Sequence, residues 1–265
     1  MLCDFHTHLH QYDEGDTALG QIAARGIITV ASSMDFESYE KTRRMAALSG
    51  LIVPTFGIHP ARAGKIACGG AGRSGVGAAD ASALAADPRW DAYLRESPII
   101  GEIGLDLLWW KDVAYKDQLA AFEAFLDHCH RERKYCVLHT KGAERETLEV
   151  LANYPGARPI IHWYNGPERE FLEITRRGYY CTFGCELKRS ACLQDLLRRT
   201  PRERVLAETD NPESERWLGG ERRDPLLIES VVADIAAALG MSPESANELV
   251  MENSLRVLGE AGALK

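Results

Sequence analysis

The chain has 265 residues, of which 45% are hydrophobic and 26% are charged, and its formal net charge is -8. This length fits one α/β barrel or two small domains, and the composition is that of an ordinary globular protein with a sizeable core. The acidic balance argues against a protein that coats duplex nucleic acid, which usually presents a basic face. It does not exclude a pocket for one strand end, because bound divalent ions add positive charge there.

The first residues and the cysteines predict a cytoplasmic protein. The chain opens without a basic and apolar leader, and no apolar run is long enough to span a bilayer, so no membrane partner is expected. The seven cysteines are odd in number and form no Cys-x-x-Cys pair, which suits a reducing compartment. We expect Cys181 and Cys185, which lie on or near a strand, to pack in the core.

Eight short apolar runs alternate with helical patterns along the chain. We expect strands at residues 2–5, 27–31, 52–57, 99–101, 135–138, 159–161, 179–183 and 205–207. Runs that are apolar throughout are typical of parallel strands buried on both faces. Because composition does not break along the chain, the pattern predicts an α/β fold, a single-domain TIM (β/α)8 barrel over residues 1–265.

Helices and one insertion are also predicted. Residues 115–134 and 226–239 carry apolar stripes at helical spacing, and Ser242 before Pro243 indicates the start of a helix that reaches Met251. A Gly/Ala-rich segment at 63–80 follows the third strand, and we expect a surface loop there, with a lid over the site as the alternative. The segment lacks the Walker spacing of a phosphate-binding loop.

Metal-binding residue types recur at the carboxyl ends of the predicted strands. They are His6 and His8 after the first strand, Glu102 after the fourth, His139 after the fifth, His162 after the sixth and Asp210 after the eighth. Because active sites of such barrels lie at this end, we interpret the six together as a metal site. A lone histidine is more often a core or surface residue, and we assign that role to His128 and His130, late in a predicted helix.

Six ligands suit two ions better than one, because a single catalytic zinc usually takes three protein ligands. We assign His6, His8 and Asp210 to one ion, His139 and His162 to the other, and Glu102 as the bridge. Residues i and i+2 of a strand point to one face, so the first histidine pair can chelate one ion. Two ions about 3.5–4 Å apart can hold a bridging water and clamp a phosphoryl group. Glu102 and Asp210 are then catalytic, with Asp210 as general base, and the ions can be Zn, Mg, Mn or Co.

Six motifs occur in order along the chain. They are D-x-H-x-H-L at 4–9, G-x-H-P at 57–60, G-E-I-G-L-D at 101–106, Leu-His at 138–139, His-Trp-Tyr-Asn-Gly at 162–166, and P-x-x-R followed by E-T-D-x-P between 201 and 212. The series resembles the TatD family of metal-dependent deoxyribonucleases and hydrolases over most of the chain. This resemblance implies a barrel fold, divalent metal ions and phosphodiester hydrolysis, often from a 3′ end of DNA.

The positions that would face a substrate depart from the family pattern, whereas the ligand positions match it. Lys141 stands where Arg is common, and Trp163 stands where Cys is common. A lysine meets a phosphate as a point charge, without the two-pronged geometry of arginine. We expect His59, Arg62 and Lys141 to contact substrate or phosphate. Trp163 or Tyr164 would stack on a base, and a core position for Trp163 is an equal alternative.

Three functions remain open at this point. The first is a two-metal phosphodiesterase, a 3′–5′ exonuclease that acts on the 3′ end of single-stranded DNA. The second keeps the metals but hydrolyses an amide, ester or lactone of a small molecule. The third is a metal-loaded, non-catalytic subunit of a protein complex, against which the intact ligand set argues.

Overall fold

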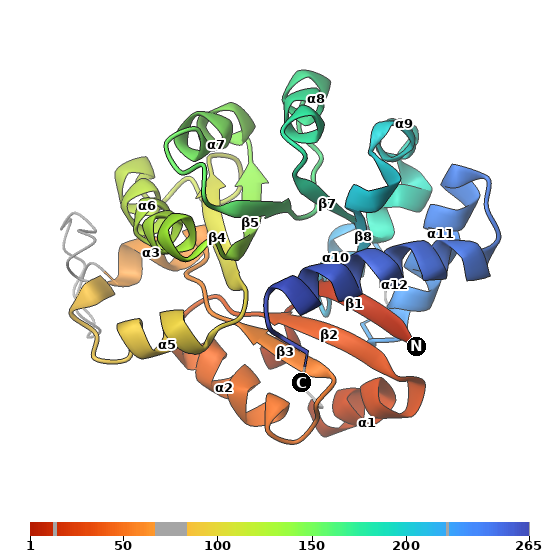
Figure 1. Ribbon diagram of the computed structural model, residues 1–265, viewed down its shortest axis with the longest axis horizontal. Helices are drawn as coiled ribbons and strands as arrows, with labels where there is room; N and C mark the ends of the chain where they lie inside the picture. Colours follow the sequence, from red (N-terminus) through yellow and green to blue (C-terminus); the bar gives the residue numbers. More distant parts are fainter. Residues whose placement is uncertain (13–14, 67–83, 221–222, 265) are drawn as a thin grey trace.

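The computed structural model describes residues 1–12, 15–66, 84–220 and 223–264, and eight parallel strands form its centre (Figure 1). They are β1 (Leu2–Thr7), β2 (Ile27–Ser32), β3 (Ile52–Thr55), β4 (Ile100–Asp106), β5 (Tyr135–Lys141), β6 (Arg158–Ile161), β7 (Tyr180–Phe183) and β8 (Val205–Ala207). Neighbours pair in chain order within β1–β3 and within β4–β8. Phe56 bridges Ile100 at one seam, and at the other the Asp210 amide donates to the His6 carbonyl over 2.9 Å. The predicted barrel is confirmed.

Five strand ends differ from the prediction, and two of them lie in the first strands, since β1 continues to Thr7 rather than residue 5 and β2 to Ser32 rather than residue 31. β4 continues to Asp106 and β5 to Lys141, whereas β3 ends at Thr55 rather than at residue 57. A strand predicted from an apolar run ends at the first polar residue. The hydrogen-bonded ladders of β4 and β5 instead continue through the polar layer at the barrel's carboxyl end. His6, Glu102 and His139 therefore lie within strands and not after them.

Helices surround the strands (Figure 1). They are α1 (Gly15–Arg25), α2 (Phe36–Ala46), α3 (Pro60–Ile66), α5 (Trp90–Glu96), α6 (Tyr115–Glu132), α7 (Glu144–Leu151), α8 (Glu168–Arg176), α9 (Ala191–Arg199), α10 (Ser214–Trp217), α11 (Leu227–Leu239) and α12 (Pro243–Glu260), with short 3₁₀ turns at η1 (Leu9–Gln11), η2 (Cys185–Arg189) and η3 (Arg202–Arg204). Ser242 caps α12 as predicted, accepting from the Ser245 amide over 3.2 Å, but this helix extends well beyond Met251. Of the predicted insertion at 63–80, residues 63–66 belong to α3 and the rest lies outside the described residues.

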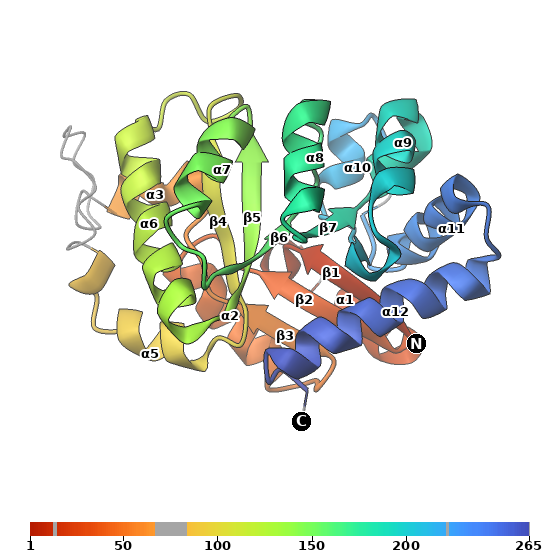
Figure 2. The same cartoon turned by 45° about the horizontal axis from the view of Figure 1, so that its top comes forward.

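Two apolar cores hold the barrel. The larger one lies between strands and surrounding helices and includes Cys181 and Cys185, as expected. The smaller one joins residues from the strands, such as Phe5 and Val137, to Met251 and other residues of α12. Figure 2 shows α12 running across one end of the barrel. Burial of the α12 side chains closes that end, so the polar layer faces the opposite one.

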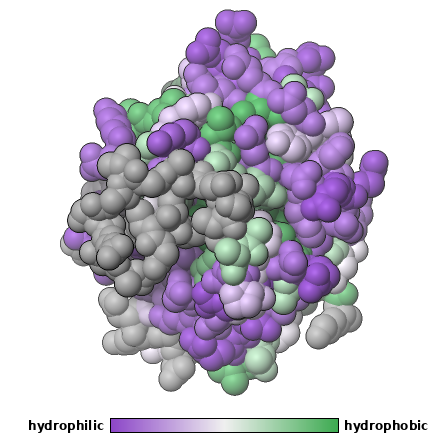
Figure 3. All heavy atoms as spheres, turned by 90° about the vertical axis from the view of Figure 1, so that its left-hand side faces the viewer, coloured by the Kyte–Doolittle hydropathy of each residue, from purple (hydrophilic) through white to green (hydrophobic). Residues whose placement is uncertain are grey.

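The part of the surface that is coloured in one space-filling view (Figure 3) is largely polar. Figure 3 shows one face on which hydrophilic side chains predominate and hydrophobic ones form small patches between them. Among the helices that the structure describes, none is long and apolar enough to cross a membrane.

Candidate metal centre

Strand geometry aims the predicted ligands at the barrel axis. On β5 and β6 the inward residues Val137 and Ile160 precede His139 and His162 by two positions, so simple alternation turns both histidines inward. The alternation of inward and outward side chains fails on β1, because Phe5 points inward and so does His6, the next residue. The register of β1 shifts between residues 4 and 7, and that of β4 shifts between residues 100 and 103. Such irregularities re-aim side chains next to sites, here those of His6 and Glu102.

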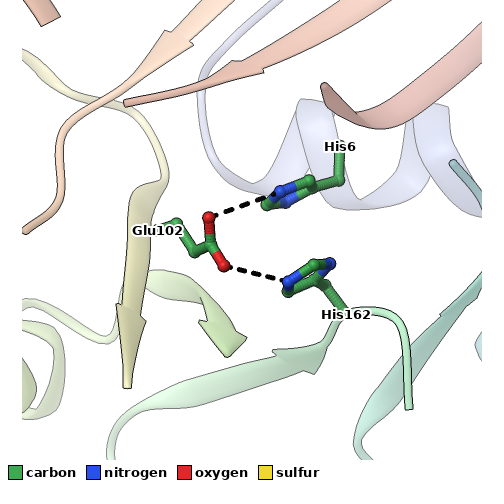
Figure 4. A group of neighbouring side chains, drawn as sticks. All are labelled: His6, Glu102 and His162. Carbon is green, nitrogen blue, oxygen red and sulfur yellow. Dashed lines mark ion pairs between the residues drawn. The ribbon is translucent and has the colours of Figure 1, made fainter. Parts of the chain in front are cut away.

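Glu102 lies at the middle of the cluster, and each of its oxygens faces a different pair of histidines. Oε1 is 2.9 Å from His139 Nδ1 and 2.9 Å from His162 Nε2. Oε2 is 3.3 Å from His8 Nε2 and 3.6 Å from His6 Nε2. Figure 4 shows Glu102 reaching from β4 toward the parallel rings of His6 and His162, which stack 3.9 Å apart.

Asp210 completes the half of the cluster near β1. Its Oδ1 lies 3.3 Å from His6 Nε2 and 3.4 Å from His8 Nε2. Its backbone adopts a left-handed φ of 52°, which a non-glycine residue holds only where neighbours over-determine it. The amide of Asp210 is bonded to the His6 carbonyl, and the His8 amide to the Asn211 carbonyl over 2.8 Å. These bonds fix the carboxylate beside the two histidines.

The other ring nitrogen of each of these four histidines faces an oxygen. His8 Nδ1 donates to the Ser32 carbonyl (3.2 Å), and His6 Nδ1 lies 3.0 Å from the Ser32 hydroxyl. His139 Nε2 donates to Asp106 (2.7 Å), and His162 Nδ1 lies 3.4 Å from Glu208. Metal-bound histidines typically pair their second ring nitrogen with a carboxylate, a backbone carbonyl or water in this way. The remaining nitrogen of each ring is directed at the centre of the cluster.

The buried atoms at the centre fit cations. His6 Nε2, His162 Nε2, Glu102 Oε2 and Asp210 Oδ1 are buried without a hydrogen-bond partner in the described chain. Buried polar atoms of this kind are rare and costly unless an ion or a ligand satisfies them. Burial opposes ionisation of Glu102, but His59, His162 and His6 outweigh it and hold its pKa well below the usual value. The centre thus offers anionic oxygens and imidazole nitrogens, the donor set of a divalent metal site.

His59 reaches the same cluster, but the bonds of its ring differ from those of the four predicted ligand histidines. Its Nε2 lies 3.5 Å from Glu102 Oε1 and 3.3 Å from His139 Nδ1, within metal-binding range of both. However, its Nδ1 accepts the Ala61 amide over 3.0 Å, so the ring proton is on Nε2. Burial lowers the pKa of His59 to about 3, so the ring is neutral. His59 therefore presents an N–H donor to the cluster.

Sequence reasoning missed two carboxylates that orient ligands. Asp106 holds His139 through Oδ2, while its Oδ1 accepts the amides of Leu108 (2.8 Å) and Trp109 (2.6 Å). Glu208 faces His162 and accepts the Trp163 amide over 2.8 Å. Both lie in motifs, and Glu208 follows the inward Leu206 by two positions, so alternation could have placed it.

A glycine after the end of β3 allows the chain to approach β4 at the cluster. A Cβ on Gly57 would lie 2.4 Å from the Glu102 carbonyl oxygen. No larger residue fits there without moving the backbone of β4. The G-x-H-P motif thus brings the chain that carries His59 directly against Glu102.

A cavity of about 700 Å³ opens from the cluster. Arg62, on α3, and Lys141 line it, as does Trp163. Lys141 is buried, and its Nζ donates to the Trp163 carbonyl and to Asn165 Oδ1 (3.2 Å). Tyr164 does not line the cavity, because it is buried against Phe171 with a ring separation of 5.2 Å. The expectation that Tyr164 stacks on a base was therefore wrong.

The remaining predicted histidines lie outside the cavity wall. His128 is buried on α6, and His130 Nδ1 accepts the Gly156 amide over 2.8 Å. Both have the structural role that their helix positions predicted.

The fold and site are those of a metal-dependent hydrolase barrel, and comparison with known proteins gives the family. Residues 3–259 match the family model described as TatD related DNase, so the chain belongs to this family. Human "Deoxyribonuclease TATDN3" is 23% identical over 273 residues, covering 97% of this chain and 94% of the relative. "Uncharacterized metal-dependent hydrolase YcfH" of Escherichia coli is also 23% identical, over 97% of this chain and 95% of its own.

Solved structures agree in fold. The TatD homologue YJJV of Escherichia coli superposes with a TM-score of 0.78 over 97% of each chain, at 18% sequence identity. A hydrolase TatD family protein from Entamoeba histolytica gives 0.76 at 17% identity, again over 97% of both chains. The predicted family, barrel and hydrolase class are thus confirmed.

Proposed function

We propose that this chain is a two-metal phosphodiesterase that removes nucleotides from the 3′ end of a single DNA strand. The observation that carries the proposal is the division of ligands around Glu102, whose two oxygens face His139 with His162 and His6 with His8. A carboxylate that bridges two ions must direct each of its oxygens at a different ion, and therefore at a different group of ligands. Asp210 adds a second anionic ligand to the half that contains His6. Family membership and relatives named as deoxyribonuclease or metal-dependent hydrolase support it.

The bound ions, which can be zinc, magnesium or manganese, would supply the nucleophile and neutralise phosphoryl charge. The chain's own residues bind the ions, position the phosphate and move protons. Burial opposes ionisation of Asp210, but His6, His162 and His8 hold its pKa below the usual value. Asp210 is therefore an available proton acceptor, the role of a general base. The Nε2–H of His59 would donate to a phosphoryl oxygen at the cluster, and Arg62 and Lys141 add positive charge on the cavity wall.

The cavity supports action at a strand end. A volume of about 700 Å³ lies within the range of pockets that enclose one small ligand, and it is too small for a duplex, whose major groove alone is about 12 Å wide. A terminal phosphodiester of an unpaired strand can enter such a cavity, whereas an internal bond of a duplex cannot.

End-labelled oligonucleotides test this proposal. With Mg²⁺, Mn²⁺ or Zn²⁺ present, a 3′-labelled single strand should release its label as mononucleotide at once, and the 5′-labelled strand should shorten stepwise. Glu102→Gln should abolish both, whereas Glu144→Gln, at a buried glutamate outside the cavity wall, should retain both. Failure of the wild type to hydrolyse any DNA with all three metals contradicts the proposal.

One observation favours the hydrolysis of an amide, ester or lactone instead. Of the described residues that line the cavity, Arg62 is the one arginine and Lys141 the one lysine, and Lys141 is buried and already bonded. Glu186 and Glu213 add negative charge to the same wall. A panel of small uncharged esters, lactones and amides would reveal this activity in a protein that binds metal but leaves DNA intact.

We also propose a cytoplasmic location. The six cysteines that the structure describes are all free thiols, which agrees with a reducing compartment.

A further inference from the structure

Tryptophans are concentrated at the cavity. The chain has five, and four of them line the cavity wall: Trp109, Trp110, Trp163 and Trp217. Trp109 is 45% exposed and Trp217 57%. Large aromatic side chains are usually buried, and a cluster of exposed ones beside a site indicates a binding surface.

Trp109 and Trp217 present adjacent exposed ring surfaces, while Trp110, which is 43% exposed, lies beside His59 with a centroid separation of 6.3 Å. The centroids of Trp109 and Trp217 are 5.7 Å apart, at an angle of 60°. Trp163 lies 5.9 Å from Trp217 but is only 6% exposed, and its indole N–H donates to Glu186 over 2.6 Å. Trp163 therefore packs against Trp217 and leaves little ring surface for a ligand to contact.

A buried cation holds this arrangement together. Lys141 Nζ lies 5.3 Å from the Trp109 centroid and 5.6 Å from the Trp163 centroid, within cation–π range of both. Because its ammonium is also bonded to the Trp163 carbonyl and to Asn165, Lys141 fixes the spacing of the two tryptophans. The charge of Lys141 thus helps to position the aromatic wall of the cavity, which Trp109, Trp163 and Trp217 form. It also contributes to the electric field inside the cavity.

The aromatic wall is continuous with the metal cluster. The Trp109 ring lies 6.1 Å from that of His139, and one carboxylate, Asp106, holds both the Trp109 amide and His139 Nε2. A flat group that stacks on Trp109 would therefore lie close to His139 of the metal cluster.

We propose that Trp109 and Trp217 form a subsite for the nucleobase of the terminal nucleotide of an unpaired strand. The inference rests on the proposed function and adds base-dependent recognition to it. Any base has a π-face, so stacking here tolerates all four bases. A base within a duplex already has its faces stacked on neighbours, so the subsite selects single-stranded ends.

Tryptophan fluorescence of metal-free protein tests the subsite without turnover. A single-stranded tetrathymidylate should quench the emission and bind about 5- to 100-fold more tightly than the same strand with an abasic 3′ end. Trp217→Phe should keep this preference, whereas Trp109→Ala and Trp217→Ala should lose it. Leu108→Ala, at an exposed residue beside Trp109 but outside the cavity wall, serves as the matched control and should behave like the wild type.

Cleavage by the metal-loaded enzyme separates this inference from the proposed function. Wild type should cleave the base-bearing end faster than the abasic end by a similar factor, and Trp217→Ala should cleave both alike. DNA cleavage without base dependence, or equal or absent quenching by the two strands, overturns the subsite and leaves the proposed function intact. Base-dependent quenching by a protein that hydrolyses no DNA supports the subsite and contradicts the proposed function.

Discussion

Replacement of Asp106 by Asn tests whether a buried carboxylate sets the ligand state of His139. Asp106 Oδ2 lies 2.7 Å from His139 Nε2, and a carboxylate can only accept, so the ring proton is on Nε2 and Nδ1 is left to face Glu102 at 2.9 Å. Burial opposes ionisation of Asp106, but its bond to His139 keeps its pKa below the usual value. In Asp106→Asn the amide oxygen can keep the bond to the Trp109 amide, while the NH2 group faces Nε2. The proton of the His139 ring would then move from Nε2 to Nδ1, the nitrogen that faces the metal site.

The expected loss follows from this change of tautomer. Groups that hydrogen-bond to metal-bound histidines contribute about 10- to 100-fold in metal affinity or activity, which corresponds to about 1.4–2.8 kcal/mol. Asp106→Ala should lose more, because the amides of Leu108 and Trp109 also lose their acceptor. Competition with a chromophoric chelator measures the affinity, and Asp127→Asn on the exposed face of α6 controls for lost charge. Metal affinity and activity within twofold of wild type in Asp106→Asn would refute the reasoning.

Two further predictions concern histidines of the cluster. His59→Gln should keep the wild-type metal content but lower kcat about 100-fold, because a donor to the phosphoryl group is lost and no ligand is; a matching loss of bound metal would show that His59 is a ligand. Burial lowers the pKa of His162, but Glu102 and Glu208 outweigh it and raise that pKa from 6.5 to about 10. Because folding raises the pKa of His162, its pairing with Glu102 and Glu208 stabilises the metal-free protein in full below pH 6.5. This stabilisation is lost as the pH rises through about 10. Thermal melting should therefore show metal-free protein losing stability over this window and metal-loaded protein, whose ion displaces the proton, losing less; a metal-free Tm that rises with pH contradicts the assignment.

The fold could be predicted from the sequence because buried parallel strands leave continuous apolar runs. The same runs located the ligand candidates, since residue types such as His139 and His162 follow inward residues by two positions. Strand ends were less accurate, because the ladders of β4 and β5 continue into the polar layer. The position of α12 across the barrel end also depends on packing that no local pattern records.

Other features of the site depend on contacts between distant segments. The register shift that turns His6 inward has no signature in an apolar run, because it arises from pairing with β2. Asp106 and Glu208 stood within motifs, yet their roles depend on the rings that they face in space. The burial of Lys141 between two tryptophans likewise brings together residues that are far apart in the chain.

Metal stoichiometry of the purified protein tests the central claim, that Glu102 joins two ions at one end of the barrel. After loading with Mn²⁺ or Zn²⁺ and removal of excess ions, elemental analysis of wild type should give about two ions per chain. Glu102→Gln should hold at most one, and Glu144→Gln should match the wild type. A wild type that holds a single ion, or a Glu102→Gln variant that keeps two, would contradict the bridged site.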